Sequence, residues 1–217
     1  MVQDTRMPTF ADMIKEQKTQ LLPVMERFGT IQGEGTFTGW AAWFIRLGGC
    51  DVGCVWCDVK ESWPAEGHPL MSPEDLATEA SAFAGDVTVI TGGEPLMYNL
   101  DELTQALHEQ ERQTHLETSG AYPLSGEWDW ICVSPKKFKP ALPQVLAAAS
   151  ELKVVIYHKS DFEWAEKQSE KVHEDCLLYL QPEWSKREEL MPLIVEYVKN
   201  NPDWQISLQT HKYLNIP

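Results

Sequence analysis

Short apolar runs alternate with longer amphipathic segments from residue 21 to the end of the chain. The run 41–47 (Ala-Ala-Trp-Phe-Ile-Arg-Leu) predicts a buried strand that stops at two glycines, and the β-branched run 86–91 predicts a second strand. Five more strands are expected near 114–118, 130–133, 152–156, 177–180 and 205–208.

Residues that favour helix starts stand between these strands. Ser72 followed by Pro73 predicts a helix that extends to about Ala84, because serine caps a first turn and proline fits into it. Asn99 predicts the start of a second helix that extends to about Arg112. Further helices are expected near 143–149, 161–172 and 186–199.

This alternation predicts an α/β fold in which parallel strands are joined by crossover helices. Six or seven strands in about 190 residues are too few for a complete eight-stranded barrel, so we expect a partial, open TIM-type barrel. Residues 21–217 would form one domain. Residues 1–20 are polar and lack strong periodicity, which predicts an N-terminal extension or a short surface helix.

The composition narrows the class of partner. The 217 residues include 18 Lys and Arg against 33 Asp and Glu, giving a net charge of −15. Phosphate binding needs basic side chains, so this charge argues against direct contact with nucleic acid and favours a small-molecule partner. Neither a membrane-length apolar run nor a secretory signal is present in the sequence, and a cytoplasmic protein is expected. The five cysteines fit a reducing compartment and a metal site better than a disulfide framework.

Polar motifs follow five of the predicted strands. Because parallel α/β sheets build their sites at the carboxyl ends of strands, motifs at one edge predict a single site. The motifs are the cysteine run after the first strand, Gly92-Gly93-Glu94-Pro95 after the second, Glu117-Thr118-Ser119-Gly120 after the third, Ser134-Pro135-Lys136 after the fourth and Gln181-Pro182 after the sixth.

The cysteine run carries the most specific chemistry. Cys50, Cys54 and Cys57 have C-x3-C-x2-C spacing, which suits three irons of a 4Fe–4S cluster and leaves the fourth iron without a protein ligand. The alternatives are a structural zinc site, which normally needs four ligands, or unligated thiols. No second cysteine pair exists, and Cys132 and Cys176 lie in apolar strand segments, where buried core thiols are expected.

The cysteine run followed by Gly-Gly-Glu-Pro resembles the radical S-adenosylmethionine (SAM) superfamily. In that superfamily the open iron binds SAM, and an electron from the cluster cleaves the sulfonium to release a 5′-deoxyadenosyl radical. Motifs in order along residues 22–217 resemble one family in particular, the 7-carboxy-7-deazaguanine synthases. The matching segments are 28–35, the cysteine run, 89–95, 117–120, 133–136 and 209–217.

The resemblance implies a reaction and its cofactors. It implies a radical SAM lyase that converts 6-carboxy-5,6,7,8-tetrahydropterin to 7-carboxy-7-deazaguanine with loss of ammonia, in the biosynthesis of queuosine and related 7-deazapurines. A 4Fe–4S cluster, SAM and Mg²⁺ would be the cofactors. The enzyme would be a homodimer, and a protein such as flavodoxin or ferredoxin would supply electrons.

The resemblance also assigns site residues by position. Arg46 would pair with the substrate carboxylate, for which a guanidinium is suited, although an ordinary surface ion pair is the alternative. Glu117 would accept hydrogen bonds from the guanidine-like edge of the pterin, unless it is a surface acid. The other expected substrate contacts are Ile31, Gln32, Gly33, Thr91, His211 and Pro217. The expected SAM contacts are Trp56, Asp58, Gly93, Glu94, Ser134, Pro135, Lys136, Leu180, Gln181, Pro182 and Glu183.

One position departs from the family pattern. Val59 stands two places after Cys57, where the family commonly has a threonine whose hydroxyl helps to hold Mg²⁺. Valine has no side-chain oxygen, so water or another oxygen such as Asp58 would have to replace it, or the enzyme depends less on Mg²⁺.

Two rival functions remain open at this point. A radical SAM activase, which makes a glycyl radical on a partner protein, would share the cysteines and the Gly-Gly-Glu-Pro turn. It would not need Arg46, Gln32 or the ending 211–217. A non-enzymatic metal or electron-transfer module predicts four cluster ligands and no SAM cleavage.

Overall fold

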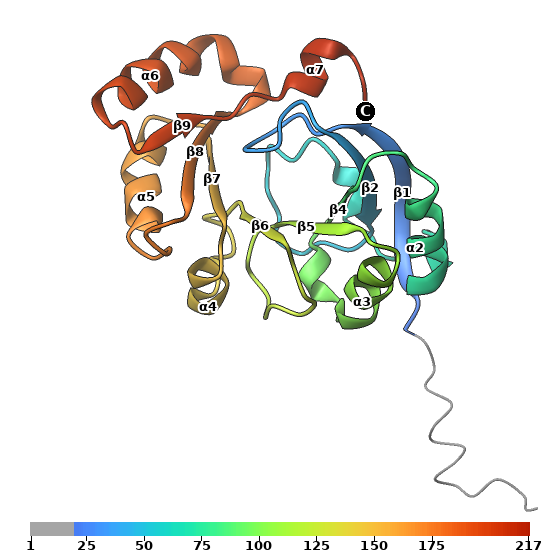
Figure 1. The fold of residues 1–217 in the computed structure, drawn as a ribbon. Helices are drawn as coiled ribbons and strands as arrows, with labels where there is room; N and C mark the ends of the chain where they lie inside the picture. The colour runs from blue at the N-terminus through green and yellow to red at the C-terminus, as the bar shows by residue number, and fades with distance from the viewer. Residues whose placement is uncertain (1–19) are drawn as a thin grey trace, which may run out of the picture.

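The computed structural model describes residues 20–217, and the predicted N-terminal extension lies outside them except for its last residue. One sheet of nine strands dominates this part of the chain, in the order β3-β1-β2-β4-β5-β6-β7-β8-β9 (Figure 1). The strands are β1 (Leu22–Ile31), β2 (Ala41–Leu47), β3 (Leu70–Met71), β4 (Val87–Gly92), β5 (Gln113–Thr118), β6 (Trp130–Val133), β7 (Glu151–Ile156), β8 (Leu177–Pro182) and β9 (Trp204–Ile206).

The sheet is an open barrel with a parallel run of seven strands. From β2 to β9 every neighbouring pair is parallel, as the strand–helix alternation predicts. Two strands that the sequence did not predict add an antiparallel edge, because β1 pairs with β2, and β3 with β1, in antiparallel register. The end strands β3 and β9 are not neighbours, so the barrel stays open.

Helices cover the outer face of the sheet (Figure 1). Apolar side chains from the longer helices, among them Leu76, Leu103 and Ile194, pack against strand residues in one buried core. The helices are α2 (Pro73–Ser81), α3 (Asp101–Glu109), α4 (Pro143–Ala147), α5 (Ser160–Ser169), α6 (Arg187–Asn200) and α7 (Thr210–Leu214), with short 3-10 turns at Lys60–Ser62, Pro95–Met97 and Trp184–Lys186. None of the helices in the described part of the chain is long and apolar enough to cross a membrane.

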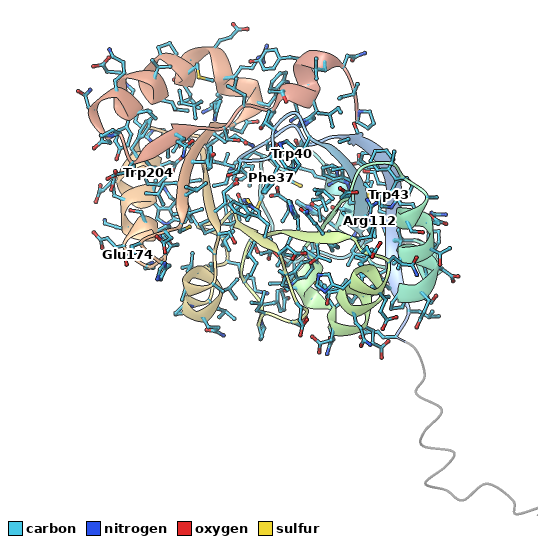
Figure 2. All side chains as sticks on the ribbon, in the orientation of Figure 1. Phe37, Trp40, Trp43, Arg112, Glu174 and Trp204 are labelled. Atoms are coloured by element: carbon cyan, nitrogen blue, oxygen red, sulfur yellow. The ribbon has the colours of Figure 1, made fainter. Side chains whose placement is uncertain are left out.

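The ends of α2 and α3 differ from expectation, because α2 stops at Ser81 before the predicted Ala84, and the N-cap of α3 is Leu100, one residue after the predicted Asn99. The Ser72 side chain accepts a hydrogen bond from the Asp75 amide, which confirms the predicted start of α2. Helix α3 stops at Glu109, short of the predicted end at Arg112, because Glu111 is left-handed with φ of 56°. Arg112 then turns inward and donates to the carbonyls of Phe83 and Val87 (Figure 2).

Phe37 and Trp40 of the β1–β2 connection belong to an aromatic cluster inside the barrel. Phe37 packs against His115 of β5, with ring centroids 4.4 Å apart, and against Trp130 of β6 at 5.0 Å. Trp40 contacts the edge of the same ring (Figure 2). Burial lowers the pKa of His115 to about 4, so this histidine is neutral at physiological pH.

Candidate active site

The three cysteines lie on one loop, residues 49–63, which we call the cluster loop. Two backbone hydrogen bonds close its base, from the Gly49 amide to the Ser62 carbonyl (2.7 Å) and from the Cys50 amide to the Trp63 carbonyl (2.9 Å). The glycine turn after β4 packs against this base so closely that a Cβ on Gly93 would lie 2.0 Å from the Gly49 oxygen. Glycine at position 93 therefore lets the second motif support the cluster loop.

Glu94 joins the ends of two strands. Its carboxylate accepts hydrogen bonds from the Ser119 amide (2.8 Å), the Leu96 amide (3.1 Å) and the hydroxyls of Thr118 and Ser119, and the residue is 1% exposed. These bonds link the Gly-Gly-Glu-Pro turn after β4 to the Glu-Thr-Ser-Gly motif at the end of β5. The two motifs therefore form one rigid wall of the site.

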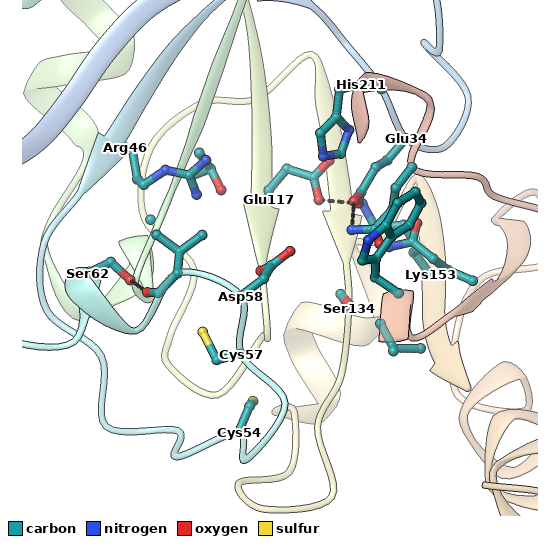
Figure 3. A pocket seen from close by; sticks show the side chains of 18 of the residues that line it. Glu34, Arg46, Cys54, Cys57, Asp58, Ser62, Glu117, Ser134, Lys153 and His211 are labelled. Atoms are coloured by element: carbon teal, nitrogen blue, oxygen red, sulfur yellow. Dashed lines mark hydrogen bonds and ion pairs between the residues drawn. The ribbon is translucent and has the colours of Figure 1, made fainter. Parts of the chain in front are cut away.

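Cys50, Cys54 and Cys57 line one cavity, and Figure 3 shows the thiols of Cys54 and Cys57 there. All five cysteines are free, and burial raises the pKa of Cys54 to about 11, while Lys136 opposes this rise. No three His, Cys, Asp or Glu side chains of the described residues converge on a point that could hold a single metal ion. A 4Fe–4S cluster takes each thiolate on a different iron, so three separated thiols fit that group better than one zinc ion.

The cavity has a volume of about 540 Å³ and collects most of the expected site residues. It reaches from the cluster loop to the end of β1 and to the C-terminal residues. Pro135 and Leu180 do not line it, and Leu180 is fully buried in the core. The expected residues that line it are Ile31, Gln32, Gly33, Arg46, Cys50, Cys54, Trp56, Cys57, Asp58, Val59, Thr91, Gly93, Glu94, Glu117, Ser134, Lys136, Gln181, Pro182, Glu183, His211 and Pro217.

A cationic side chain stands at one end of the cavity. Arg46, on β2, donates through Nε to Oε1 of Glu26 at 2.6 Å, and the two residues are direct cross-strand partners. Thr91 is beside Arg46 in the parallel register with β4. Both Arg46 and Thr91 line the cavity, whereas Glu26 does not. Because Glu26 binds only Nε, the two terminal nitrogens of the guanidinium remain available to an anion.

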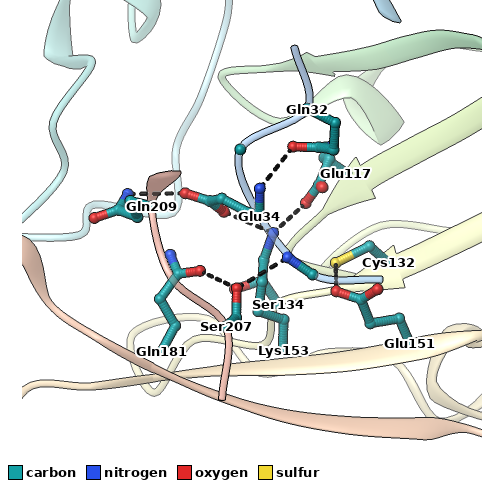
Figure 4. Close-up of polar contacts among 12 residues, drawn as sticks. Gln32, Glu34, Glu117, Cys132, Ser134, Glu151, Lys153, Gln181, Ser207 and Gln209 are labelled. Carbon is teal, nitrogen blue, oxygen red and sulfur yellow. Dashed lines mark hydrogen bonds and ion pairs between the residues drawn. The ribbon is translucent and has the colours of Figure 1, made fainter. Parts of the chain in front are cut away.

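The opposite end holds three charged side chains that we call the charged triad: Glu34, Lys153 and Glu117. Lys153 Nζ lies 2.7 Å from Glu34 Oε2 and 2.9 Å from Glu117 Oε2 (Figure 4). The other Glu34 oxygen accepts from Gln209 Nε2 at 2.8 Å. Burial opposes ionisation of Glu34, but Lys153 and Gln209 together lower its pKa to about 2.

The C-terminal residues close over this end. A Cβ on Gly33 would lie 2.2 Å from His211 Nδ1, so the α7 side chain rests directly on the chain that follows β1. The Thr210 amide donates to the Gly33 carbonyl (2.9 Å), and Thr30 Oγ1 donates to the Pro217 carbonyl (3.1 Å). Burial lowers the pKa of His211, although Glu34 opposes this, so a neutral imidazole faces the cavity near pH 7.

The wall beside the cluster loop carries the expected SAM contacts. Lys136 Nζ donates to the carbonyl and hydroxyl of Ser134, at 2.7 and 2.6 Å, and stands 5.4 Å from the centre of the Trp56 ring. Gln181, which was expected after its strand, lies inside β8 and accepts from Ser207 Oγ at 2.7 Å. Hydroxyl, ammonium and aromatic groups thus line the side of the cavity nearest the cysteines.

The expected Mg²⁺ position has few oxygen ligands. Val59 lines the cavity without a side-chain oxygen, and its carbonyl accepts from the Ser62 amide and hydroxyl. Asp58 Oδ2 is paired with Lys212 Nζ at 2.6 Å. Asp58 Oδ1 has no hydrogen-bond partner among the described residues, so these two residues leave one free carboxylate oxygen, whereas a dedicated Mg²⁺ site needs several oxygen ligands.

Sequence reasoning missed several residues that line the cavity. Glu34 sits inside a motif that was noticed, but no role was assigned to it. Lys153 carried a usable signal, because a lysine in the middle of an apolar strand is rarely buried without a charged partner. Gln209 and Lys212 lie in the matching C-terminal segment and contact Glu34 and Asp58.

Comparison with known proteins places these features in context. The family model described as the Radical SAM superfamily matches residues 44–157. The chain is 56% identical to the 7-carboxy-7-deazaguanine synthase of Flavobacterium psychrophilum, over 94% of this chain and 97% of that one. It is 46% identical to the enzyme of that name from Synechocystis sp., with the same coverage. The crystal structure of QueE from Escherichia coli superimposes with a TM-score of 0.76 at 32% identity, covering 87% of this chain and 93% of that one.

Proposed function

The chain belongs to the 7-carboxy-7-deazaguanine synthase family of the radical SAM superfamily, and we propose that it converts 6-carboxy-5,6,7,8-tetrahydropterin to 7-carboxy-7-deazaguanine with loss of ammonia. The reaction makes it a carbon–nitrogen lyase in the biosynthesis of queuosine and related 7-deazapurines. The activase alternative is disfavoured, because relatives across nearly the whole chain carry the synthase name.

One observation carries the proposal: three cysteines, a guanidinium and a buried carboxylate line the same cavity. In Figure 3, Glu117 lies between Arg46 and Lys153, with Cys54 and Cys57 on the cluster loop below them. A substrate with a carboxylate on one side and ring N–H donors on the other matches this charge distribution. An activase would have to admit a polypeptide and would need neither end.

The position of each residue in the cavity indicates which part of the substrate it would contact. The Arg46 terminal nitrogens would bind the substrate carboxylate, with Glu26 holding the guanidinium in place. Glu117 would accept from the amino edge of the ring. Ile31, Gln32, Gly33 and Thr91 would border the ring, and His211 and Pro217 would exclude water from above.

The cysteines and the wall next to them would hold the cofactors. Cys50, Cys54 and Cys57 would ligate a 4Fe–4S cluster, and the cluster with SAM would supply the radical that starts the reaction. The side chains and backbone that would contact SAM are those of Trp56, Asp58, Gly93, Ser134, Lys136, Gln181, Pro182 and Glu183. Glu94 would act through the wall that it builds, since its oxygens already accept hydrogen bonds from β5. Pro135 and Leu180 would support this wall from outside the cavity.

Other parts of the proposal concern the surroundings of the enzyme. Residues 21–217 would act as one radical SAM domain, and the chain would work as a homodimer. A flavodoxin or ferredoxin would deliver the electron. Free thiols and a low-potential cluster fit a cytoplasmic location.

Anaerobic reconstitution with iron and sulfide tests the proposal. The loaded protein would be given SAM, dithionite and 6-carboxy-5,6,7,8-tetrahydropterin, and products would be identified by mass spectrometry. We expect 7-carboxy-7-deazaguanine without a stoichiometric amount of 5′-deoxyadenosine. Deoxyadenosine with no pterin turnover would instead favour an activase, and a protein that binds no cluster would favour a simple metal module.

A further inference from the structure

The charged triad contains a lysine that the proposed reaction does not use. The Lys153 side chain is 4% exposed and bridges two carboxylates that come from different parts of the chain. Glu34 follows β1, Glu117 is near the end of β5, and Lys153 is in β7. Burial of a lysine in a barrel wall has an unfavourable free energy of desolvation, and only such anionic partners offset it.

The charges around the triad explain its state. Burial by itself lowers the pKa of Lys153, but the groups around it raise that pKa well above its ordinary value. Lys153 is therefore a permanent cation and not a proton donor. Burial raises the pKa of Glu117 above its ordinary value, Glu34 and Glu151 add to this rise, and Lys153 opposes it. The other titratable groups that face Lys153 or Glu117 are Glu34, Cys132, Lys136, Glu151 and His211.

The carboxylates of Glu34 and Glu117 differ in how many of their oxygens have a partner. Both oxygens of Glu34 have partners, Lys153 and Gln209. Only Oε2 of Glu117 is paired with Lys153, and among the described residues no N–H or O–H group donates to its Oε1. Because Glu117 lines the cavity, this oxygen is available to a bound molecule (Figure 4).

We propose that Lys153 is a positioning residue that keeps Glu117 ionised and oriented, and thereby makes the cavity selective for a ring that carries an amino group beside a ring N–H. This inference rests on the proposed function and extends it to the basis of substrate choice. An ionised carboxylate accepts hydrogen bonds from both donors of a 2-amino-pyrimidinone edge. It repels the carbonyl that a 2-oxo ring presents at the same place.

Loss of the lysine would weaken this discrimination. Without Lys153, Glu117 and Glu34 would face each other with no cation between them, and two close carboxylates cannot both remain ionised near neutral pH. A protonated Glu117 presents a hydroxyl to the ring, which matches an oxo group as well as an amino group. Selectivity would then return only as rising pH removes the proton.

The experiment uses the reconstituted protein with SAM and two stable probes, 6-carboxypterin and 6-carboxylumazine, which differ in an amino or oxo group at the ring edge. Dissociation constants would be measured by fluorescence from about pH 5 to about pH 7.5, a range in which a raised carboxyl pKa is visible. For the wild-type chain we expect a preference of roughly 30-fold for the amino probe near pH 7, on the order expected for an unmatched buried polar group.

Lys153→Met should reduce this preference to about threefold or less at about pH 6 and restore it as the pH rises to about 7.5, because the Glu117 pKa is higher without the cation. Lys153→Arg should rescue it. Lys167→Met removes an exposed α5 lysine paired with Glu163 and serves as the matched control, with an unchanged preference. Near-UV circular dichroism and cluster absorbance would establish that each variant is folded and loaded.

A second variant keeps the inference testable if Lys153→Met does not fold. Glu117→Gln leaves Lys153 paired with Glu34 and should make the preference small and independent of pH. An unchanged preference in Lys153→Met or in Glu117→Gln would overturn the inference, as would equal weakening of both probes by Lys153→Met at every pH. Turnover of the tetrahydropterin by the wild-type chain is scored separately, so failure of the proposed function and failure of this inference give different results.

Discussion

The cluster loop and the charged triad are built in opposite ways. All three thiols of the cluster loop come from eight consecutive residues, and backbone hydrogen bonds close the loop locally. The triad takes its members from the segment after β1, from β5 and from β7, and they meet only because the barrel folds. The cluster loop can therefore be recognised from a short stretch of sequence, whereas the charged triad forms only when the barrel folds.

This difference separates what each region controls. The loop places soft ligands for a metal group at the rim of the barrel, where the reaction would start. The triad and Arg46 place fixed charges inside the barrel, where the substrate would be recognised. Changes in the cluster loop should therefore abolish chemistry, whereas changes inside the barrel should alter which molecule binds and how tightly.

The largest effect should follow loss of a cysteine in the cluster loop. Cys54→Ala removes one of three ligands and should reduce iron content from about four per chain to below about one, with turnover lost, because a cluster with two protein ligands is unstable. Iron and sulfide analysis with visible absorbance measures this. Cys176→Ala, which removes a buried thiol outside the cavity, should keep its iron. Normal iron in Cys54→Ala would show that the loop is not the cluster site.

A substitution at Arg46 tests the charged groups inside the barrel. Arg46→Ala should raise KM about 100-fold, corresponding to the loss of roughly two charge-assisted hydrogen bonds, while iron content stays normal. Arg27→Ala is the matched control, because Arg27 also binds a glutamate through Nε, namely Glu79, but does not line the cavity. Loss of the cluster in Arg46→Ala, or equal effects of the two variants, would contradict the division between the regions.

The same contrast explains what the sequence could predict. Strands β2 and β4 to β9 follow from apolar runs and glycine stops, and the cysteine motif from its spacing, because these signals are local. Strand β1 was missed, since it mixes exposed and buried positions and ends in polar residues that belong to the site. The short α7 was missed because its five residues contain no buried position and rest on contacts with distant chain segments.

The site residues also differ in whether a local sequence signal reveals them. Arg46 and Glu117 could be proposed because each lies in a recognisable segment. Their pairings with Glu26 and Lys153 could not, although Lys153 stands out in an apolar strand, because a pairing between strands depends on register and on burial. The antiparallel direction of β1 brings Glu34, which follows it, to Lys153 of β7, and nothing in the local pattern of residues 22–31 specified that direction.

A substitution at Gly33 should have a smaller, steric effect, which tests whether the C-terminal segment closes over the cavity. Gly33→Ala places a Cβ against the His211 ring, so α7 should move away from the cavity and KM should rise about tenfold, with iron content unchanged. Steady-state kinetics measures this change. In a His211→Gly background the added methyl should cost nothing further, because both the ring and the Cβ of His211, which lies 2.8 Å from the added methyl, are gone. Additive losses in the double variant would mean that the C-terminal segment does not close over the cavity through this contact.

The smallest effect concerns Mg²⁺, at the boundary between the two regions. Omission of Mg²⁺ from metal-depleted buffer should lower kcat/KM by less than about twofold, because Mg²⁺ prefers several oxygen ligands and this position offers few. Val59 offers only a carbonyl that already accepts from Ser62, and Asp58 has one oxygen paired with Lys212 and one left free. Val59→Thr restores a hydroxyl and should make the rate respond to added Mg²⁺, measured as a titration of initial rates. A steep dependence in the wild-type chain would show that substrate or water completes a metal site here, and that the cluster loop takes part in substrate binding after all.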